Sequence, residues 1–102
     1  MRRWAMIYPV IEIMTYRLRD DVDAEAFSVL DEEVQTSLYY QQRGLVRRTT
    51  ARSTDDTVVS ITVWSNVEAA NAAHALFLGP TGATFRGAIA ESSIDVRRYE
   101  NL

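Results

Sequence analysis

The stretch Val58–Leu78, VVSITVWSNVEAANAAHALFL, predicts a strand, a sharp turn and a helix in one continuous run. Val58–Trp64 is β-branched or aromatic at every position except Ser60, which favours a strand. Ser65 lies three residues before Glu68, the spacing of a capping box that begins a helix. The apolar residues that follow recur at helical spacing: Ala69, Ala73, Leu76 and Phe77.

This strand–helix corner also carries two side chains suited to a binding site. Trp64 ends the strand just before the helix begins. His74, the single histidine of the chain, lies two to three turns along the helix. If the protein has a pocket, we expect this corner to form one of its walls.

The composition excludes several classes of protein. With 102 residues, 47% hydrophobic and 25% charged, the chain predicts a single domain over residues 1–102, near the size at which a second copy adds stability. A net charge of −3 argues against a nucleic-acid partner, which would require a basic excess. No run of about 18 apolar residues is present, so we expect no membrane span.

The residue types that are missing exclude much familiar chemistry. The chain has no cysteine, its eleven basic side chains are all arginines, and it has one histidine. Thiol nucleophiles, zinc–thiolate sites, Schiff-base lysines and multi-histidine metal centres within one chain are therefore excluded, and we predict no metal and no cofactor. The absence of cysteine fits a cytoplasmic location. The basic and apolar start, Met1–Ile13, is better explained by a first strand than by a signal peptide, because Pro9 and Glu12 interrupt it.

The first strand is predicted over Val10–Leu18, with apolar residues on both of its faces. Both faces are therefore expected to be covered by other parts of the protein. Glu12 lies among the apolar residues of one face. It is either an edge charge that reaches solvent or an interior carboxylate, and the rarity of unpaired buried carboxylates favours the first interpretation.

A first helix is predicted from Ala24 to Tyr40, with Asp23 as its N-cap and Gly44 as the stop or turn residue beyond it. Its apolar stripe is Phe27, Leu30, Val34 and Leu38. Tyr39 and Tyr40 at its end either line a pocket mouth or cover the helix end, and the second is the commoner role of such residues.

Two further strands form a hairpin, Leu45–Ser53 and Val58–Trp64, joined by a short polar turn. Arg47 and Arg48 lie on opposite faces of the first of these strands. Whichever of them faces a cavity could clamp an anion or a carbonyl group, although a solvated or interface ion pair is the commoner role.

After the second helix, Gly79-Pro80-Thr81-Gly82 predicts a break. Ala83–Ala90 then predicts a short third helix with Phe85 and Ile89 on one face. Ser93–Tyr99 predicts the last strand, with Ile94 and Val96 pointing inward.

The order β-α-β-β-α-(α)-β is that of the ferredoxin-like α+β fold, a four-stranded antiparallel sheet with its helices on one face. The strands are half apolar on both faces. We therefore predict that the face without helices packs against a second copy to form a homodimer.

At this level the chain resembles the dimeric α+β barrel superfamily, and within it the antibiotic biosynthesis monooxygenase group. The resemblance extends from Val10 to Tyr99. The parts that carry it are Arg43-Gly44-Leu45, Val63-Trp64, Ser65-x-x-Glu68-Ala69-Ala70 and Ala73-His74.

The resemblance implies a small hydrophobic pocket between sheet and helices, which in this group oxidises or rearranges polyphenolic or polyketide-like molecules, often without a cofactor. It assigns catalytic roles to His74 as proton acceptor, to Tyr16, and to Arg47 or Arg48 as stabiliser of developing negative charge. The residues expected to bind the substrate are Met14, Tyr39, Trp64 and Phe77. Trp64 and His74 can equally be a core tryptophan and a half-buried helix residue.

A related branch of the superfamily degrades haem with a strand-one asparagine, a tryptophan and a histidine. Here Thr15-Tyr16-Arg17-Leu18 offers no asparagine, and no second histidine follows Trp64. The resemblance therefore argues against haem degradation, and it leaves haem binding through His74 open.

Three functional hypotheses follow from the sequence. The first is a cofactor-independent monooxygenase or isomerase-like enzyme that acts on a small aromatic or polyketide-like compound. The second is a non-catalytic ligand-binding or stress-associated barrel, and the third is a structural dimer with a filled core. An open space shared by Tyr16, Trp64, His74 and an arginine would favour the first hypothesis.

Overall fold

The structure, a computed structural model, describes residues 8–102 and has the predicted order of elements. The strands and α-helices are β1 (Val10–Arg17), α2 (Ala24–Ser37), β2 (Leu45–Arg52), β3 (Thr57–Trp64), α3 (Val67–Leu78), α4 (Ala83–Arg86) and β4 (Asp95–Glu100). Three short 3-10 helices lie between them: Tyr39–Gln41, Pro80–Gly82 and Glu91–Ser93. Of the stretch Met1–Ile13 that the sequence explained by a first strand, residues 10–13 lie in β1, and residues 1–7 fall outside the described residues.

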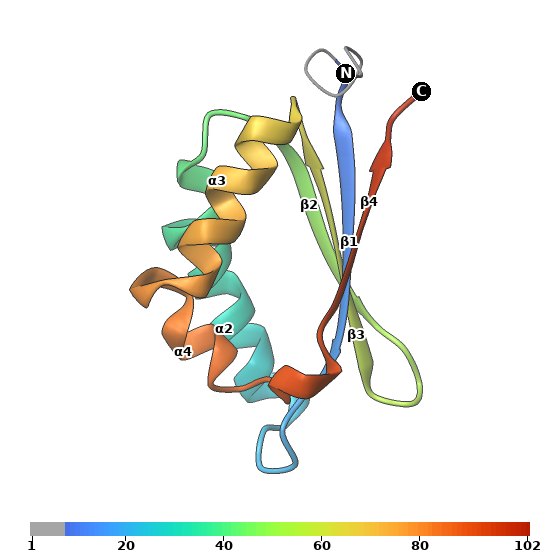
Figure 1. The fold of residues 1–102 in the computed structure, drawn as a ribbon. Helices are drawn as coiled ribbons and strands as arrows, with labels where there is room; N and C mark the ends of the chain where they lie inside the picture. Colours follow the sequence, from blue (N-terminus) through green and yellow to red (C-terminus); the bar gives the residue numbers. More distant parts are fainter. Residues whose placement is uncertain (1–7) are drawn as a thin grey trace.

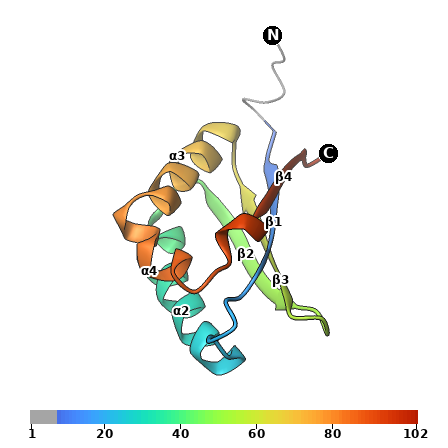
Figure 2. The same ribbon diagram turned by 60° about the horizontal axis from the view of Figure 1, so that its bottom comes forward.

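The four strands form one antiparallel sheet in the order β2-β3-β1-β4. All the helices that the structure describes lie on one side of this sheet, and the start of β1 and the end of β4 lie at the same end of the sheet (Figure 1). Figure 2 shows α2, α3 and α4 as an arc over the sheet. The predicted ferredoxin-like βαββαβ fold is therefore confirmed.

The alternation of side chains places the mixed face of β3 toward the helices. Ser60, Thr62 and Trp64 are buried, whereas Ile61 on the opposite side is 36% exposed. The apolar side chains of β1 and β3 on that opposite side have no helix over them. We call this surface the uncovered face; its apolar residues are Ile11, Ile13, Val59, Ile61, Val63 and Tyr99.

The start of α3 differs from the prediction by one residue. The N-cap is Asn66, whose side-chain oxygen accepts from Ala69 N at 2.9 Å, so the predicted cap at Ser65 is wrong. The backbone N–H of Ser65 instead donates to Gly44 O at 2.7 Å, which keeps Ser65 in line with the strands. Serine and asparagine are both good N-caps, so spacing alone did not separate them.

Gly44 is a turn residue rather than a helix stop, the second of the two roles that the sequence allowed. The helix α2 ends at Ser37, with Leu38 as its C-cap, and a 3-10 turn follows it. A Cβ atom on Gly44 would lie 2.3 Å from Ala69 Cβ. The glycine is therefore required because the start of β2 passes directly against α3.

The chain after α3 is less helical than predicted. Only Ala83–Arg86 is α-helical, because Ala88 and Ala90 bond to the backbone at the end of β1: Arg19 N donates to Ala88 O at 3.0 Å and Ala90 N donates to Arg17 O at 2.9 Å. The last strand begins at Asp95. Val96 pairs with the buried Met14 and so lies on the helix side of the sheet as predicted, but it is 37% exposed because β4 is an edge strand that the helices cover incompletely.

Candidate functional site

Six of the eight candidate site residues lie in the layer between the sheet and the helices. We call this the helix–sheet layer, and each of the six is at most 8% exposed. They are Met14, Tyr16, Tyr39, Arg48, Trp64 and Phe77.

Tyr16 joins the aromatic side of this layer. Its ring makes edge-on contacts with Phe27 and Phe85, at centroid distances of 6.1 and 6.0 Å. Its hydroxyl lies 3.1 Å from Ser60 Oγ, in a buried hydrogen bond. The ring is therefore held in place by aromatic packing, and the buried hydroxyl group has the hydrogen-bond partner that a tyrosine needs in an apolar interior.

Arg48 brings a buried positive charge to the same layer. Its side chain has no exposed surface, and it donates through NH2 to Asp31 Oδ1 at 2.8 Å and through NH1 to Gln35 Oε1 at 3.2 Å. The guanidinium also lies over the Tyr39 ring, 4.5 Å from its centroid. The cation is thus compensated by α2 and by an aromatic face, as burial of a charge requires.

A polar row crosses the buried face of the sheet at the level of Arg48. The register places Arg98, Glu12, Thr62 and Arg48 side by side on β4, β1, β3 and β2. Arg98 Nε donates to Glu12 Oε2 at 2.8 Å, and Arg98 also bonds to Asn71 on α3. Glu12 is therefore an interior carboxylate with a cationic partner, and the solvent-reaching interpretation was wrong.

Tyr39 and Trp64 complete the wall beside Arg48, with ring centroids 6.1 Å apart. Trp64 is fully buried, and its indole Nε1 has no hydrogen-bond partner among residues 8–102. Tyr39 is 3% exposed and so contributes to the core rather than to a pocket mouth in the single chain.

The two remaining candidates lie elsewhere. His74 is half-buried on α3 and stacks on Phe77, with ring centroids 6.3 Å apart. Two phenylalanine rings separate it from Tyr16, since Phe77 contacts Phe85 and Phe85 contacts Tyr16. Arg47 points to the uncovered face, opposite to Arg48, so Arg48 is the arginine that faces the helix–sheet layer.

A groove between α2 and the sheet reaches the Arg48 network. It has a volume of about 310 Å³, and Asp31 and Gln35, the partners of Arg48, line it. We call it the α2–β2 groove; its other lining residues are Ala24, Phe27, Ser28, Glu32, Thr50, Ala51, Arg52 and Val58.

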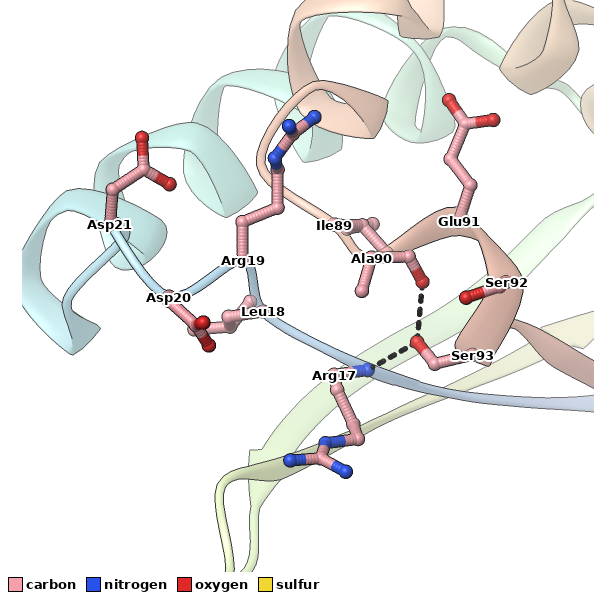
Figure 3. A pocket seen from close by; sticks show the side chains of 10 residues that line it. All are labelled: Arg17, Leu18, Arg19, Asp20, Asp21, Ile89, Ala90, Glu91, Ser92 and Ser93. Atoms are coloured by element: carbon pink, nitrogen blue, oxygen red, sulfur yellow. Dashed lines mark hydrogen bonds between the residues drawn. The ribbon is translucent and has the colours of Figure 1, made fainter.

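A larger hollow of about 770 Å³ lies where β1 ends, beside Glu91–Ser93 (Figure 3). Five charged side chains line it, and it has no aromatic wall: Arg17, Arg19, Asp20, Asp21 and Glu91. Ser93 fixes its edge, accepting from Arg17 N and donating to Ala90 O. None of the eight candidate residues lines this hollow or the α2–β2 groove.

Burial controls the ionisation of the two tyrosines. It raises the pKa of Tyr39 to about 12, although the Arg48 guanidinium partly offsets the rise. Burial likewise raises the pKa of Tyr16 well above its ordinary value, and the Ser60 hydroxyl partly offsets that shift. Near neutral pH both phenols therefore stay protonated and can donate, but not accept, a proton.

We expect these tyrosines to weaken the fold at alkaline pH. Because their pKa values are raised on folding, their contribution to stability is complete below about pH 10 and is lost as pH rises towards about 12. The measurement is the free energy of unfolding in urea between pH 8 and 11.5. The Tyr39→Phe variant should lose less stability over this range than the wild type, and parallel curves would contradict the expectation.

Sequence reasoning did not single out Asp31, Gln35, Asn71 or Arg98. Asp31 and Gln35 lie outside the apolar stripe of the first helix, although their spacing of four residues could have shown that they share one face. Arg98 and Asn71 depend on pairing between distant segments, which the sequence alone does not fix. Among residues 8–102, no group of three or more histidine, cysteine, aspartate or glutamate side chains is placed to hold a metal ion.

The sequence matches no known family model. It also matches no curated protein.

Solved structures do share the fold. SnoaB, a cofactor-independent oxygenase from Streptomyces nogalater, is 21% identical with a TM-score of 0.72, over 89% of this chain and 90% of that one. A candidate antibiotic biosynthesis monooxygenase from Caulobacter crescentus is 10% identical with a TM-score of 0.75, over 95% and 92% of the two chains.

A conserved protein of unknown function from Bacteroides thetaiotaomicron, a candidate oxidoreductase, is 13% identical with a TM-score of 0.67, over 93% and 99% of the two chains. The predicted resemblance to antibiotic biosynthesis monooxygenase structures is thus confirmed at the level of the fold. At these identities the fold is what is shared, and activity requires its own argument. No helix within residues 8–102 has the length and apolar character needed to cross a membrane.

Proposed function

We propose that this chain forms a cytoplasmic homodimer in which each protomer binds a small aromatic or polyketide-like molecule in its helix–sheet layer and oxygenates it without a metal or organic cofactor. The observation that supports this most directly is the layer itself, where a buried guanidinium and two protonated phenols lie among aromatic walls. The described activity of SnoaB, which has the same fold, agrees with this proposal.

The chemistry requires a substrate that is its own reductant. A proton leaves an activated phenol or methylene group, the resulting anion gives electrons to dioxygen, and one oxygen atom enters the substrate. The other oxygen atom leaves as water with two substrate hydrogens, so that a methylene group becomes a carbonyl group. The protein's part is to accept a proton, to stabilise the anion with Arg48 and to exclude water, with Met14, Tyr16, Tyr39, Trp64 and Phe77 as walls.

The test is oxygen uptake with a panel of phenols, naphthols and polycyclic enols. Controls are the substrate alone, heat-unfolded protein and protein treated with a chelator to remove stray metal ions. Uptake that needs folded protein and survives the chelator would support the proposal. Background uptake with every compound that binds would overturn it.

A non-catalytic binding protein is the second candidate function. The observation that favours it is the α2–β2 groove of about 310 Å³, which has room for a ligand but is lined by none of the eight candidate site residues. The same panel separates the two candidates, because this function predicts saturable binding without oxygen uptake.

In the oxygenase proposal His74 is the proton acceptor. We expect His74→Ala to lower turnover by about 100-fold or more, as the loss of a general base does. Leu78→Ala, at a 59% exposed position on the same helix, is the matched control and should change turnover by less than about threefold. Unchanged turnover in a folded His74→Ala protein would remove His74 from the mechanism.

The homodimer is proposed to form through the uncovered face. We expect Ile61→Arg to convert the dimer into a monomer, because it places a charge at the centre of an apolar interface. Sedimentation velocity at micromolar concentration measures the mass. Val29→Arg, at a 54% exposed position on α2, should leave the dimer intact, and a monomeric wild type would contradict the proposal.

A further inference from the structure

We propose that the α2–β2 groove binds a small planar hydroxy-aromatic molecule, whose hydroxyl group donates to Asp31 Oδ2 and accepts from the amide group of Gln35. This goes beyond the proposed function, because the groove lies on the α2 side of the molecule and shares no lining residue with the surroundings of His74.

Arg48 fixes the orientation of both polar groups in the groove. Its NH1 donates to Gln35 Oε1 and its NH2 donates to Asp31 Oδ1. A guanidinium has donors but no acceptor, so the oxygen of Gln35 must be the end that faces it. The NH₂ end of Gln35 is therefore the end that remains to donate to a ligand.

Asp31 supplies the matching acceptor. Its Oδ1 accepts from Arg48 and, at 3.3 Å, from Thr50 Oγ1, whereas no side chain within residues 8–102 donates to Oδ2. The Asp31 side chain keeps 17% of its surface exposed, so this oxygen is not sealed in the core. Asp31 and Gln35 lie four residues apart on α2, which places them on one helix face.

The floor of the groove is apolar. Phe27 and Val58 line it and are 6% and 0% exposed, so a ligand ring there would lie against fixed carbon surface. The volume of about 310 Å³ is at the lower end of the range for small-molecule sites and suits one or two fused rings.

Charge and hydrogen-bonding capacity select the ligand class. A neutral hydroxyl both donates and accepts, so one such group can satisfy an acceptor and a donor that lie side by side. A carboxylate in its place would lie beside Asp31, the like charge at the polar end of the groove. Glu32 also lines the wall, and the cation there, Arg52, has Asp56 as its ion-pair partner at 3.8 Å. We therefore expect a neutral phenol or naphthol to bind more tightly than the corresponding acid.

The experiment is a titration of the isotope-labelled protein with 2-naphthol, followed by two-dimensional amide NMR. Naphthol should shift the signals of Phe27, Gln35 and Thr50 in a saturable way. The methyl ether 2-methoxynaphthalene, which cannot donate, and 2-naphthoate should each bind at least about fivefold more weakly.

Gln35→Met keeps the length of the side chain and removes both its amide donor and the oxygen that accepts from Arg48. We expect it to weaken naphthol binding about five- to tenfold, whereas Gln41→Met, the same change outside the groove, should leave binding unchanged. Three outcomes would overturn the proposal: shifts centred elsewhere, equal binding of the ether, or no effect of Gln35→Met. Groove binding of 2-naphthol with only background oxygen uptake across the whole panel would support this inference and overturn the oxygenase, whereas oxygen uptake without groove binding would overturn this inference and support the oxygenase.

Discussion

Replacing Trp64 with alanine is expected to lower the free energy of unfolding by about 3–5 kcal/mol, because it leaves a large void at a fully buried position. Trp64 ends β3, packs on Tyr39 and lies where the chain turns into α3. A void at this position weakens the packing between the end of β3 and the start of α3, the corner on which the predicted fold rests.

The variant Trp64→Phe separates the volume of the ring from its polar group. The indole Nε1 is buried and has no partner within the described chain, so phenylalanine loses no hydrogen bond there. We expect Trp64→Phe to lower the free energy of unfolding by about 1–2 kcal/mol, much less than Trp64→Ala does. Urea unfolding measures both values, and equal losses for the two variants would contradict this account of Trp64.

The second large effect concerns the buried ion pair. Arg48→Met removes the cation that binds Asp31 and Gln35. We expect it to lower the free energy of unfolding by about 3 kcal/mol. This is the lower end of the range for a broken buried ion pair, because Asp31 keeps partial access to water. The exposed pair of Arg97 and Asp95 is the matched control, and Arg97→Met should cost less than about 1 kcal/mol.

A double variant identifies the origin of that cost. If it comes from the stranded Asp31 carboxylate, then Arg48→Met combined with Asp31→Leu should recover more than half of the lost stability. Additive losses in chemical denaturation would show instead that the two side chains stabilise the fold independently.

The architecture could be predicted because the sequence patterns that specify each strand and helix lie within that strand or helix. The alternation in β3 and the apolar stripe of α2 each specify one element, and Asp23 caps α2 as expected by accepting from Ala26 N at 2.8 Å. The element boundaries were less certain where two residues could serve the same role, as with Ser65 and Asn66 before α3.

The polar interior could not be predicted, because it depends on which face of the sheet the helices cover. The more apolar face of β3 is the uncovered one, and the face with Ser60 and Thr62 is buried. That choice turns Arg48 into an interior cation and brings Glu12 to Arg98 across 86 residues of chain. Partners this far apart follow from strand order and register, which a single sequence does not reveal.

The separation of His74 from Arg48 has a consequence for the proposed chemistry. Rings of Phe77 and Phe85 lie between His74 and Tyr16, so a ligand that contacts both the histidine and the arginine must displace aromatic side chains. A ligand in the α2–β2 groove, in contrast, reaches the partners of Arg48 directly.

The measurement that most directly tests cofactor-independent oxygenation is mass spectrometry of the product formed from the best-binding phenol or enol under isotopically labelled dioxygen. The account predicts one labelled oxygen atom in the product and the other in water, at a rate that depends on folded, metal-free protein. A bound ligand that is recovered unchanged, or a product without label, would contradict it.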